Sequence, residues 1–368
     1  MTVFHTLVGQ DATVARLAAA AAGDGMTHAW LFTGPPGSGR SIAARAFAAA
    51  LQCTQRGCGV CASCRQVAEG SAPDVTRLRP EGVNIRKEEA ALVIGRMFRR
   101  PQSSPWAVVI VEDADRLTDQ AANMLLKVLE EPPERAVLML CAPSVEDILP
   151  TIRSRCRSVT LGLPSTAAIT AVLTAEGVDE TQARWAAAAA QGHIGRARAL
   201  ATDPDARDQR ARALALAGRL ASVGECLAAS GELVASAAAE ADVRTKEAQV
   251  EADALLEAVG KVRGSAGLRK EVTDRLKSQT KRSRRDALDR ALVDLAAWYR
   301  DVAVTGLGGT QLVHADQADV IRAAAAVSTP ETDLRRVEAI LECRALLTET
   351  NVDELLAVER MSLALRSA

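Results

Sequence analysis

Runs of consecutive apolar residues alternate with helical patterns along the first part of the chain. Three of these runs occupy residues 28–34, 106–115 and 136–143, and within them apolar residues do not alternate with polar ones. A strand of this kind is buried on both faces, because an exposed face would carry a polar residue at every second position. The pattern predicts a doubly wound α/β domain, in which helices cover both faces of a parallel sheet.

Two helices are predicted between these strands. Residues 41–53 follow the first strand directly, and residues 117–133 follow the second strand with an amphipathic pattern. Thr118 is expected to cap the second helix through its hydroxyl group. Pro132 is expected to stop this helix, because proline has no amide hydrogen to donate.

The distribution of proline divides the chain. Eleven of the thirteen prolines lie at or before Pro164, so the turns of a mixed domain belong to that part and the remainder is predicted to be almost entirely helical. A polar stretch around Pro204 marks a second boundary. The sequence therefore predicts an α/β domain at 1–163, a small helical domain at 164–207 and a larger helical domain at 208–368.

Two segments of the last domain have a biased composition. Residues 228–260 are rich in alanine and glutamate and are expected to form a long solvated helix without a functional site. Residues 277–285, KSQTKRSRR, form a dense basic run. Such a run is either a solvated helix face or a contact to nucleic acid, and both interpretations stay open. The glycine-rich residues 305–310 predict a break between helices.

The overall charge and hydropathy exclude several classes of protein. The net charge is −1, which excludes a general electrostatic attraction of the whole molecule to nucleic acid or to a membrane surface. The first residues lack the basic and apolar regions of a signal peptide. The alanine-rich runs are too short and too weakly apolar to cross a membrane. We therefore expect a soluble cytoplasmic protein.

The segment between the first strand and the first helix has the pattern of a phosphate-binding loop, G-x-x-x-x-G-K-[ST], with one change. Backbone amides of such a loop and the positive end of the following helix surround phosphate groups. Arg40 stands at the lysine position, and its forked guanidinium group cannot place a single charge where the lysine ammonium lies. Ser41 would hold Mg²⁺. The loop either binds nucleotide or is a tight turn kept for its shape. The candidate nucleotide-binding residues are Gly34, Pro35, Pro36, Gly37, Ser38, Gly39, Arg40 and Ser41.

The second strand ends in two acidic residues, Glu112 and Asp113. An ATPase of this class uses an aspartate to hold Mg²⁺ and a neighbouring glutamate to orient water, and here the order is reversed. Each carboxylate is therefore misplaced by one methylene group, and a misplacement of about 1 Å can cost about a hundredfold in rate. The pair either belongs to a weakened nucleotide site or simply ends the strand in solvent.

Four cysteines are clustered with the spacing C-x4-C-x2-C-x2-C, namely Cys53, Cys58, Cys61 and Cys64. Four thiolates close a tetrahedron around zinc and leave no open position, which predicts a structural zinc site. An iron–sulfur cluster and free thiols are the alternatives, but no electron-transfer feature accompanies the cysteines, and free thiols at this density would be open to oxidation. The other four cysteines stand alone and are expected to be small core residues.

Five motifs follow one another along the chain: VGQ, HAWLFTGPPGSGR, the cysteine module, AANMLLKVLEEPP and TIRSRC. In this order they resemble the clamp-loader subunits of bacterial DNA polymerase III, which are AAA+ proteins. The resemblance covers about residues 4–200. It implies an AAA+ domain with an embedded zinc module, a helical lid at 164–207 and a helical collar for oligomerisation at 208–368.

Within this family the site residues resemble the delta-prime group, whose own nucleotide site is often degraded, rather than the ATP-hydrolysing gamma/tau motor. Arg40 and the reversed acidic pair carry this resemblance. It adds Val8 and Arg196 to the nucleotide site, although Gly195 stands where the family has its sensor-2 arginine and the next helical residue points about 100° away. It also implies that Arg155 of TIRSRC is an arginine finger for ATP held by a neighbouring subunit.

The resemblance implies a function in replication, namely help in loading the sliding clamp onto primed DNA as part of the DNA polymerase III holoenzyme in the nucleoid-associated replisome. The implied partners are the gamma/tau and delta subunits, the sliding clamp and, through the complex, primed DNA. The implied cofactor is structural zinc, whereas binding of ATP with Mg²⁺ stays open and the chain's own ATPase activity is expected to be absent or weak. Two alternatives remain: an ATP-hydrolysing gamma/tau-type motor subunit, and another AAA+ ATPase such as a helicase loader.

Overall fold

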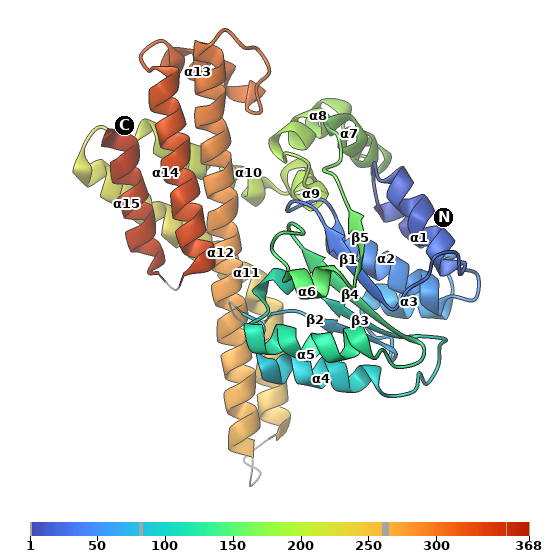
Figure 1. Ribbon diagram of the computed structural model, residues 1–368. Helices are drawn as coiled ribbons and strands as arrows, with labels where there is room; N and C mark the ends of the chain where they lie inside the picture. Colours follow the sequence, from blue (N-terminus) through green and yellow to red (C-terminus); the bar gives the residue numbers. More distant parts are fainter. Residues whose placement is uncertain (1, 81–83, 260–264, 351, 368) are drawn as a thin grey trace. The chain divides into compact units, whose positions relative to one another are not determined.

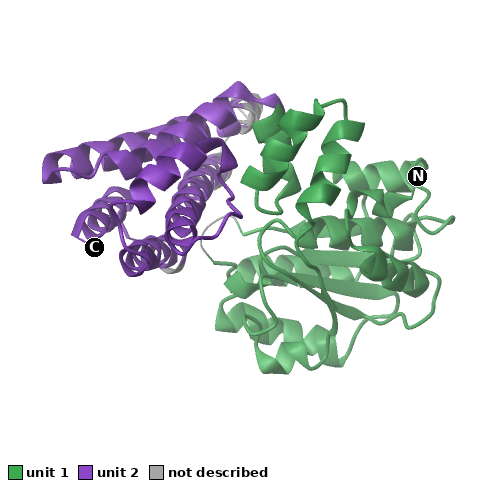
Figure 2. Ribbon diagram, turned by 90° about the horizontal axis from the view of Figure 1, so that it is seen from above, with its two compact units in different colours: residues 1–201 green, residues 202–368 purple. Residues whose placement is uncertain are grey.

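The computed structural model has two compact units, residues 1–201 and 202–368 (Figure 2). The first unit combines a parallel sheet with helices, and the described residues of the second unit contain helices and connecting loops (Figure 1). The predicted fold class, α/β followed by all-α, is thereby confirmed. The division into three domains stays a prediction. The structure describes residues 2–80, 84–259, 265–350 and 352–367.

The first unit is built on five parallel strands in the order β2-β3-β4-β1-β5. Strands β1, β3 and β4 are the three runs predicted from the sequence, and all of their residues are buried. Strand β2 lies at one edge of the sheet and is only half-buried, so a search for continuous apolar runs does not find it. The strands are β1 (Ala29–Thr33), β2 (Val75–Leu78), β3 (Ala107–Val111), β4 (Ala136–Ala142) and β5 (Arg157–Thr160).

Helices cover both faces of this sheet, because side chains alternate in direction along each buried strand. Trp30 and Phe32 of β1 belong to the core on one face, where the ring of Phe47 lies 4.8 Å from that of Trp30. Leu31 belongs to the core on the other face, together with Leu125. The first core involves α1 to α3 and the second involves α4 to α6. These helices are α1 (Asp11–Ala21), α2 (Arg40–Gln52), α3 (Ala62–Glu69), α4 (Lys87–Met97), α5 (Asp119–Glu130) and α6 (Pro150–Arg153).

Helices α2 and α5 confirm the two helices predicted from the sequence. The Thr118 hydroxyl accepts a hydrogen bond from the Ala121 amide, which is the predicted cap, and α5 ends at Glu130, two residues before Pro132. Three more helices complete the first unit: α7 (Thr166–Ala175), α8 (Glu180–Ala189) and α9 (Ile194–Thr202).

The second unit consists of long helices packed around one apolar core. Helix α12 ends at Gly306, which confirms the predicted break in the glycine-rich stretch. None of the helices that the structure describes, in either unit, has an apolar stretch sufficient to span a membrane. The helices of the second unit are α10 (Pro204–Ala215), α11 (Val223–Val259), α12 (Ser265–Gly306), α13 (Ala318–Ala325), α14 (Pro330–Glu349) and α15 (Glu354–Ser367).

The expectation of a solvated helix at 228–260 is wrong for its first half. The segment is helical as α11, but Leu233, Ala237 and Ala241 are buried. The hydroxyl groups of Ser230 and Ser362 lie 2.6 Å apart across the α11–α15 contact. Small alanine side chains bring neighbouring helices close together, so a face that looks weakly apolar in sequence is a packing face in the fold. Residue 260 lies outside the described residues.

The basic run at 277–285 lies on α12, and part of it is engaged inside the second unit. Arg284 and Arg285 both lie beside the carboxylate of Glu354, which is 4% exposed, and Arg285 also donates a hydrogen bond to the Thr350 carbonyl at 3.2 Å. A wholly solvated face is therefore excluded for these two arginines. A contact of the remaining residues with nucleic acid stays a prediction.

Candidate functional site

The glycine loop joins the carboxyl end of β1 to the start of α2, as the sequence predicts. Gly37 and Gly39 have φ angles of 90° and 88°, a region that residues with a side chain rarely adopt. A Cβ atom at Gly37 would lie 2.9 Å from the Cβ atom of His193, just before α9. The loop therefore needs glycine both for its backbone conformation and for the close approach of the chain that precedes α9.

Two polar atoms inside this loop lack partners among the described residues. Ser38 is 3% exposed, and its Oγ atom is buried without a hydrogen bond. The Nη1 atom of Arg40, at the first position of α2, is likewise buried without one. A buried polar atom without a partner costs about 1–3 kcal/mol. The loop thus contains a hydroxyl group and a guanidinium N–H that an anion can satisfy.

The next residue, Ser41, lies beside the end of β4. Burial raises the pKa of the Cys141 thiol to about 12, and a hydrogen bond with the Ser41 side chain only partly offsets this. Cys141 therefore stays a neutral thiol between the glycine loop and the acidic end of β3. Ser41 therefore lies close to this neutral thiol.

The carboxylate of Glu112, at the acidic end of β3, is occupied by two arginines. Arg77 donates to Oε1 from Nε at 3.2 Å and from Nη2 at 3.0 Å, and Arg79 donates from Nε to Oε2 at 3.0 Å. The Glu112 side chain is only 11% exposed, whereas that of Arg79 is 57% exposed. Both carboxylate oxygens of Glu112 are therefore used within the protein.

This arrangement does not fit Mg²⁺ at Glu112. A divalent cation there would meet two guanidinium charges and one carboxylate, a net excess of one positive charge. The resulting repulsion disfavours a divalent cation at Glu112. Mg²⁺ is usually bound through one or two carboxylates together with substrate phosphates, and Glu112 is not available for this purpose.

Groups of both charges surround this ion pair. Burial and the neighbouring Arg77 guanidinium lower the pKa of Arg45, which lies on α2, and only the nearby Glu112 carboxylate opposes them appreciably. Burial, together with the neighbouring Asp113 carboxylate, raises the pKa of Asp115. Asp113 itself has a φ angle of 54°, which is unusual for a residue with a side chain.

The remaining predicted nucleotide-site residues lie on two further segments of the first unit. Arg196 is half-buried in the first turn of α9, and its amide donates a hydrogen bond to the ring Nδ1 of His193 at 3.2 Å. Val8 is half-buried in the turn between the 3₁₀ helix Val3–Thr6 and α1. The approach of His193 to Gly37 brings the start of α9 to the loop, whereas the residue packed near Gly39 is Leu7, not Val8.

Arg155 follows the short helix α6, as expected for an arginine at a helix end. It donates from Nη1 to the Thr151 carbonyl at 2.9 Å and from Nη2 to Glu130 of α5 at 2.9 Å. Both side chains of the ion pair are exposed, 38% for Arg155 and 54% for Glu130. Nearby Arg157 instead bonds to the Gly25 carbonyl and lies over the ring of Trp30. Arg155 is thus held at the surface in a defined direction.

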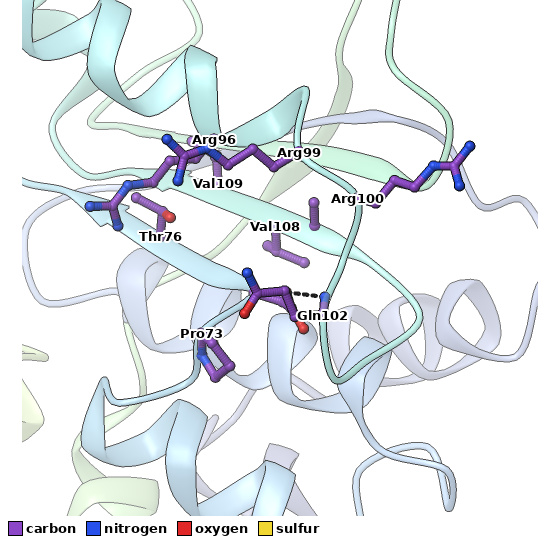
Figure 3. A pocket seen from close by; sticks show the side chains of 10 residues that line it. Pro73, Thr76, Arg96, Arg99, Arg100, Gln102, Val108 and Val109 are labelled. Atoms are coloured by element: carbon purple, nitrogen blue, oxygen red, sulfur yellow. Dashed lines mark hydrogen bonds between the residues drawn. The ribbon is translucent and has the colours of Figure 1, made fainter.

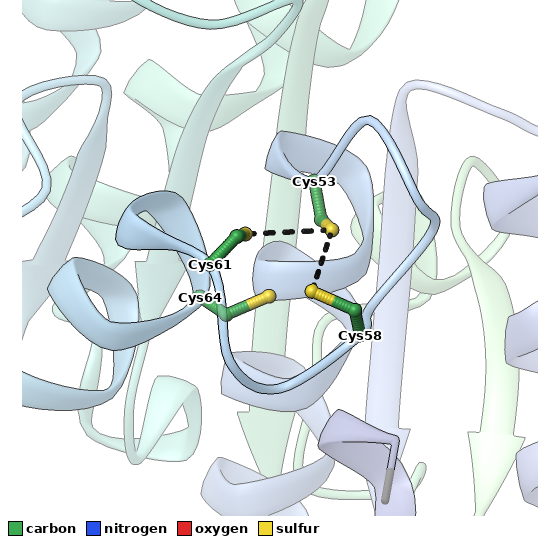
Figure 4. A group of neighbouring side chains, drawn as sticks. All are labelled: Cys53, Cys58, Cys61 and Cys64. Carbon is green, nitrogen blue, oxygen red and sulfur yellow. Dashed lines mark hydrogen bonds between the residues drawn. The ribbon is translucent and has the colours of Figure 1, made fainter.

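The four clustered cysteines come together between α2 and α3 (Figure 4). All four sulfur atoms lie within 4.8 Å of one another, and that of Cys53 is 3.7 Å from Cys58 and 3.6 Å from Cys61. Four sulfurs about 2.3 Å from a central zinc ion are separated by about 3.8 Å. The four side chains therefore fit a tetrahedral metal ion, and this cluster could hold one.

The thiol groups of this cluster differ in their pKa values. Burial disfavours the thiolate of Cys53, but hydrogen bonds from the backbone of Cys58, Gly57 and Gln55 outweigh it and lower the pKa of Cys53 to about 6. Burial raises the pKa of Cys64 to about 12. The loop around Cys53 is thus built to stabilise negative charge on sulfur, which is the form that binds metal ions.

A small pocket of about 110 Å³ lies between the amino-terminal ends of β2 and β3 and the end of α4 (Figure 3). Arg96, Arg99 and Arg100 line it together with Asp74. The carboxylate of Asp74 accepts hydrogen bonds from the amides of Gln102 and Ser103 at 2.8 and 2.9 Å. Asp74 therefore serves to hold the loop that follows α4, and the pocket is remote from the glycine loop, at the opposite end of these strands.

Part of the chain is similar in sequence to known proteins. Residues 9–164 match a family described as "DNA polymerase III, delta subunit". The gamma/tau subunit of DNA polymerase III from Mycobacterium tuberculosis H37Rv is 38% identical over 162 residues, which are 41% of this chain and 27% of that protein. The delta' subunit from Pseudomonas aeruginosa is 37% identical over 147 residues, which are 38% of this chain and 45% of that protein.

Residues 9–164 are thus similar to the clamp-loader subunits of DNA polymerase III.

The similarity to clamp-loader subunits is limited in extent. The chain spans less than half the length of each of these two relatives. A solved structure of a DNA polymerase III gamma subunit-related protein from Thermotoga maritima aligns with 96% of this chain and 99% of that one, with 17% identity and a TM-score of 0.40. Gamma/tau and delta-prime relatives match at similar identity, so the site residues must distinguish between the two groups.

Sequence analysis missed two residues, Arg77 and Arg79, that strongly alter the charge of this candidate site. Arg77 and Arg79 are two positions apart at an edge strand, so both reach the same carboxylate. The signal available in the sequence was the alternation R-L-R at residues 77–79. It becomes informative only once β2 is known to pair with β3, in a register that sets Leu78 opposite Val111.

Proposed function

We propose that this chain is a delta-prime-type subunit of the DNA polymerase III clamp loader. In this role it helps to place the sliding clamp on primed DNA, in a complex with gamma/tau and delta subunits in the cytoplasm at the replisome. The similarity of residues 9–164 to clamp-loader subunits supports the proposal. The carboxyl-terminal helical unit would serve as the collar through which the subunits associate.

The observation that carries the proposal is the ion pair of Glu112 with Arg77 and Arg79. ATP hydrolysis in this class needs Mg²⁺ beside the β- and γ-phosphates and a lysine on the same phosphates. Here the carboxylate of Glu112 is neutralised by two arginines and Arg40 replaces the lysine. These features favour a subunit that does not hydrolyse ATP over a gamma/tau-type motor.

Arg155 would complete an ATP site on a neighbouring subunit. A guanidinium group supplied in trans stabilises the charge that spreads over the phosphoryl oxygens in the transition state. Such a group must be exposed yet held in direction, and both properties are found in Arg155 through its bonds to Thr151 and Glu130. A chain with an inactive site of its own can still contribute to hydrolysis in this way.

The four-cysteine cluster would hold a structural zinc ion. Its sulfur spacing matches a tetrahedron, and the four thiolates would leave no open coordination position for substrate or water. The ion would join the end of α2 to the start of α3. It would stabilise the AAA+ domain and take no part in the chemistry of ATP.

The test is reconstitution of the clamp loader with an Arg155→Ala variant. We expect normal assembly with gamma/tau and delta, but a loss of about 10³–10⁵ in the rate of the one ATP site that Arg155 serves. Because other motor sites remain, total clamp-stimulated ATPase should fall partly and clamp loading should fall more. Arg153→Ala is the matched control, since Arg153 is exposed on the same short helix.

Three results would contradict the proposal. Unaltered hydrolysis and loading by the assembled Arg155→Ala complex would exclude the arginine finger. Robust ATP turnover by the isolated wild-type chain would favour a gamma/tau-type motor subunit. Failure of the wild-type chain to join gamma/tau would favour a different AAA+ protein, such as a helicase loader.

A further inference from the structure

The glycine loop and the acidic end of β3 point to different ligand chemistry. The loop contains two buried donors without a described partner, the Ser38 hydroxyl and the Arg40 Nη1 group. The acidic end contains a carboxylate whose two oxygens already accept three hydrogen bonds from arginines. One part of the site is therefore ready for an anion, and the other part is closed to a cation.

We propose that the loop binds the phosphate groups of a nucleotide without a divalent metal ion, and that Arg77 and Arg79 exclude Mg²⁺ by occupying Glu112. The inference rests on the proposed function only in taking the loop as a nucleotide site. Arg40 contacts the phosphates in place of lysine, and the Ser38 hydroxyl donates the second hydrogen bond. The shared ligand chemistry is a polyphosphate chain in its fully charged, metal-free form.

The charges around the loop support this preference. The guanidinium groups of Arg40, Arg45, Arg77 and Arg79 outnumber the three described carboxylates near the end of β3, which are Glu112, Asp113 and Asp115. A metal-free triphosphate carries two more negative charges than its Mg²⁺ complex, so a positively charged site binds the metal-free form more tightly. In an ordinary site of this class the acidic pair reverses this preference, because Mg²⁺ bridges it to the phosphates.

The experiment measures binding of ADP and of inorganic pyrophosphate to the isolated full-length chain by calorimetry, once with EDTA and once with excess Mg²⁺. We expect both ligands to bind in EDTA and Mg²⁺ to weaken the binding. Tighter binding of ADP than of pyrophosphate would assign the ligand as a nucleotide. Equal affinities would assign it as any polyphosphate, and both results support metal-free binding.

Variants test the part played by the two arginines. Arg77→Ala/Arg79→Ala frees Glu112, so affinity in EDTA should fall about tenfold and Mg²⁺ should now strengthen binding. Arg79→Ala alone should likewise lower the affinity in EDTA and make Mg²⁺ strengthen binding. Because the Arg79 side chain is 57% exposed, this variant should fold normally. Glu112→Gln should bind more tightly in EDTA. Arg184→Ala, which removes an exposed arginine paired with Glu180, is the control and should leave binding unchanged.

The proposal is overturned if the wild-type chain binds ADP only with Mg²⁺, or if it binds neither ligand in either condition. It is also overturned if Mg²⁺ does not strengthen binding by the double variant. None of these results affects the clamp-loader role, because that role is measured by assembly with gamma/tau and by the Arg155→Ala reconstitution.

Discussion

Replacing Cys61 by serine should lower the content of the proposed zinc ion and loosen one corner of the α/β domain. The Cys61 sulfur lies 3.6 Å from that of Cys53, close to the spacing of about 3.8 Å for two sulfurs on one zinc ion. A serine hydroxyl does not replace a thiolate as a ligand of zinc. The variant therefore keeps three of the four thiolates and leaves a coordination position open to water.

The size of the effect follows from linkage between binding and folding. A ligand that binds only the folded state at a hundred times its Kd adds about 2.7 kcal/mol to stability. Closed zinc sites bind with about 10–16 kcal/mol, so even dilute zinc is far above its Kd. The loss is therefore at least about 3 kcal/mol, which for a unit of 201 residues corresponds to a fall in Tm of about 6–12 °C.

The local effect of losing zinc can be measured near the amino terminus of the chain. The Val3 amide donates a hydrogen bond to the Gly57 carbonyl at 2.9 Å, inside the cysteine loop, and neighbouring Phe4 is buried in the core. Loss of zinc should therefore speed hydrogen exchange at Val3 more than at the centre of β4. Exchange would be measured by mass spectrometry, together with zinc content per chain and Tm.

The control for this experiment is Cys156→Ser, since Cys156 lies outside the cluster and should keep one zinc ion per chain. The reasoning would be refuted by a Cys61→Ser variant with full zinc content. A wild-type chain that is free of metal and melts at the same temperature as the zinc-loaded chain would refute it equally.

Two further predictions concern ion pairs. Glu130→Gln should change the free energy of unfolding by less than about 1 kcal/mol, because the pair that Glu130 forms with Arg155 is exposed. It should nevertheless lower the ATPase rate of the reconstituted loader, by less than Arg155→Ala does. An unchanged ATPase rate would show that Glu130 does not position Arg155. Burial opposes ionisation of Asp301, but hydrogen bonds from His314 and Arg300 outweigh it and lower its pKa. Since the folded pKa lies below the unfolded value of about 3.9, this stabilisation is complete above about pH 4 and is lost as pH falls through the folded pKa. Urea unfolding should therefore show Asp301→Asn less stable than wild type at pH 7, with the difference shrinking below pH 4; a constant difference would contradict the assignment.

The sequence predicted the centre of the sheet because central strands are buried on both faces. Strands β1, β3 and β4 are continuous apolar runs, and the position of the glycine loop follows directly from the end of β1. Strand β2 could not be found in this way, since it lies at an edge and carries Arg77 among its four residues. Its arginines look like ordinary surface residues until the sheet order is known.

The candidate site was predictable as a set of segments but not as a set of interactions. The loop and the acidic residues are motifs of consecutive residues, so the sequence contains them in full. The pairing of Arg77 with Glu112 joins residues 35 positions apart and depends on β2 lying beside β3. Likewise, the burial of Leu233 on α11 depends on which helices lie against it, and the composition of 228–260 does not contain that information.

The ion pair of Arg77, Glu112 and Arg79 also bears on how this subunit can change over evolutionary time. Under the proposed function, a gain of ATPase activity would require a lysine at position 40, a rearranged acidic pair after β3 and the loss of both arginines near β2. No one of these steps restores ATP hydrolysis alone, and removing Arg77 first would leave a largely buried carboxylate with less compensation. Intermediate sequences would therefore be less stable without being more active. Under the proposed function, a loss of hydrolysis would therefore be hard to reverse, and the chain would keep its supporting role in the complex.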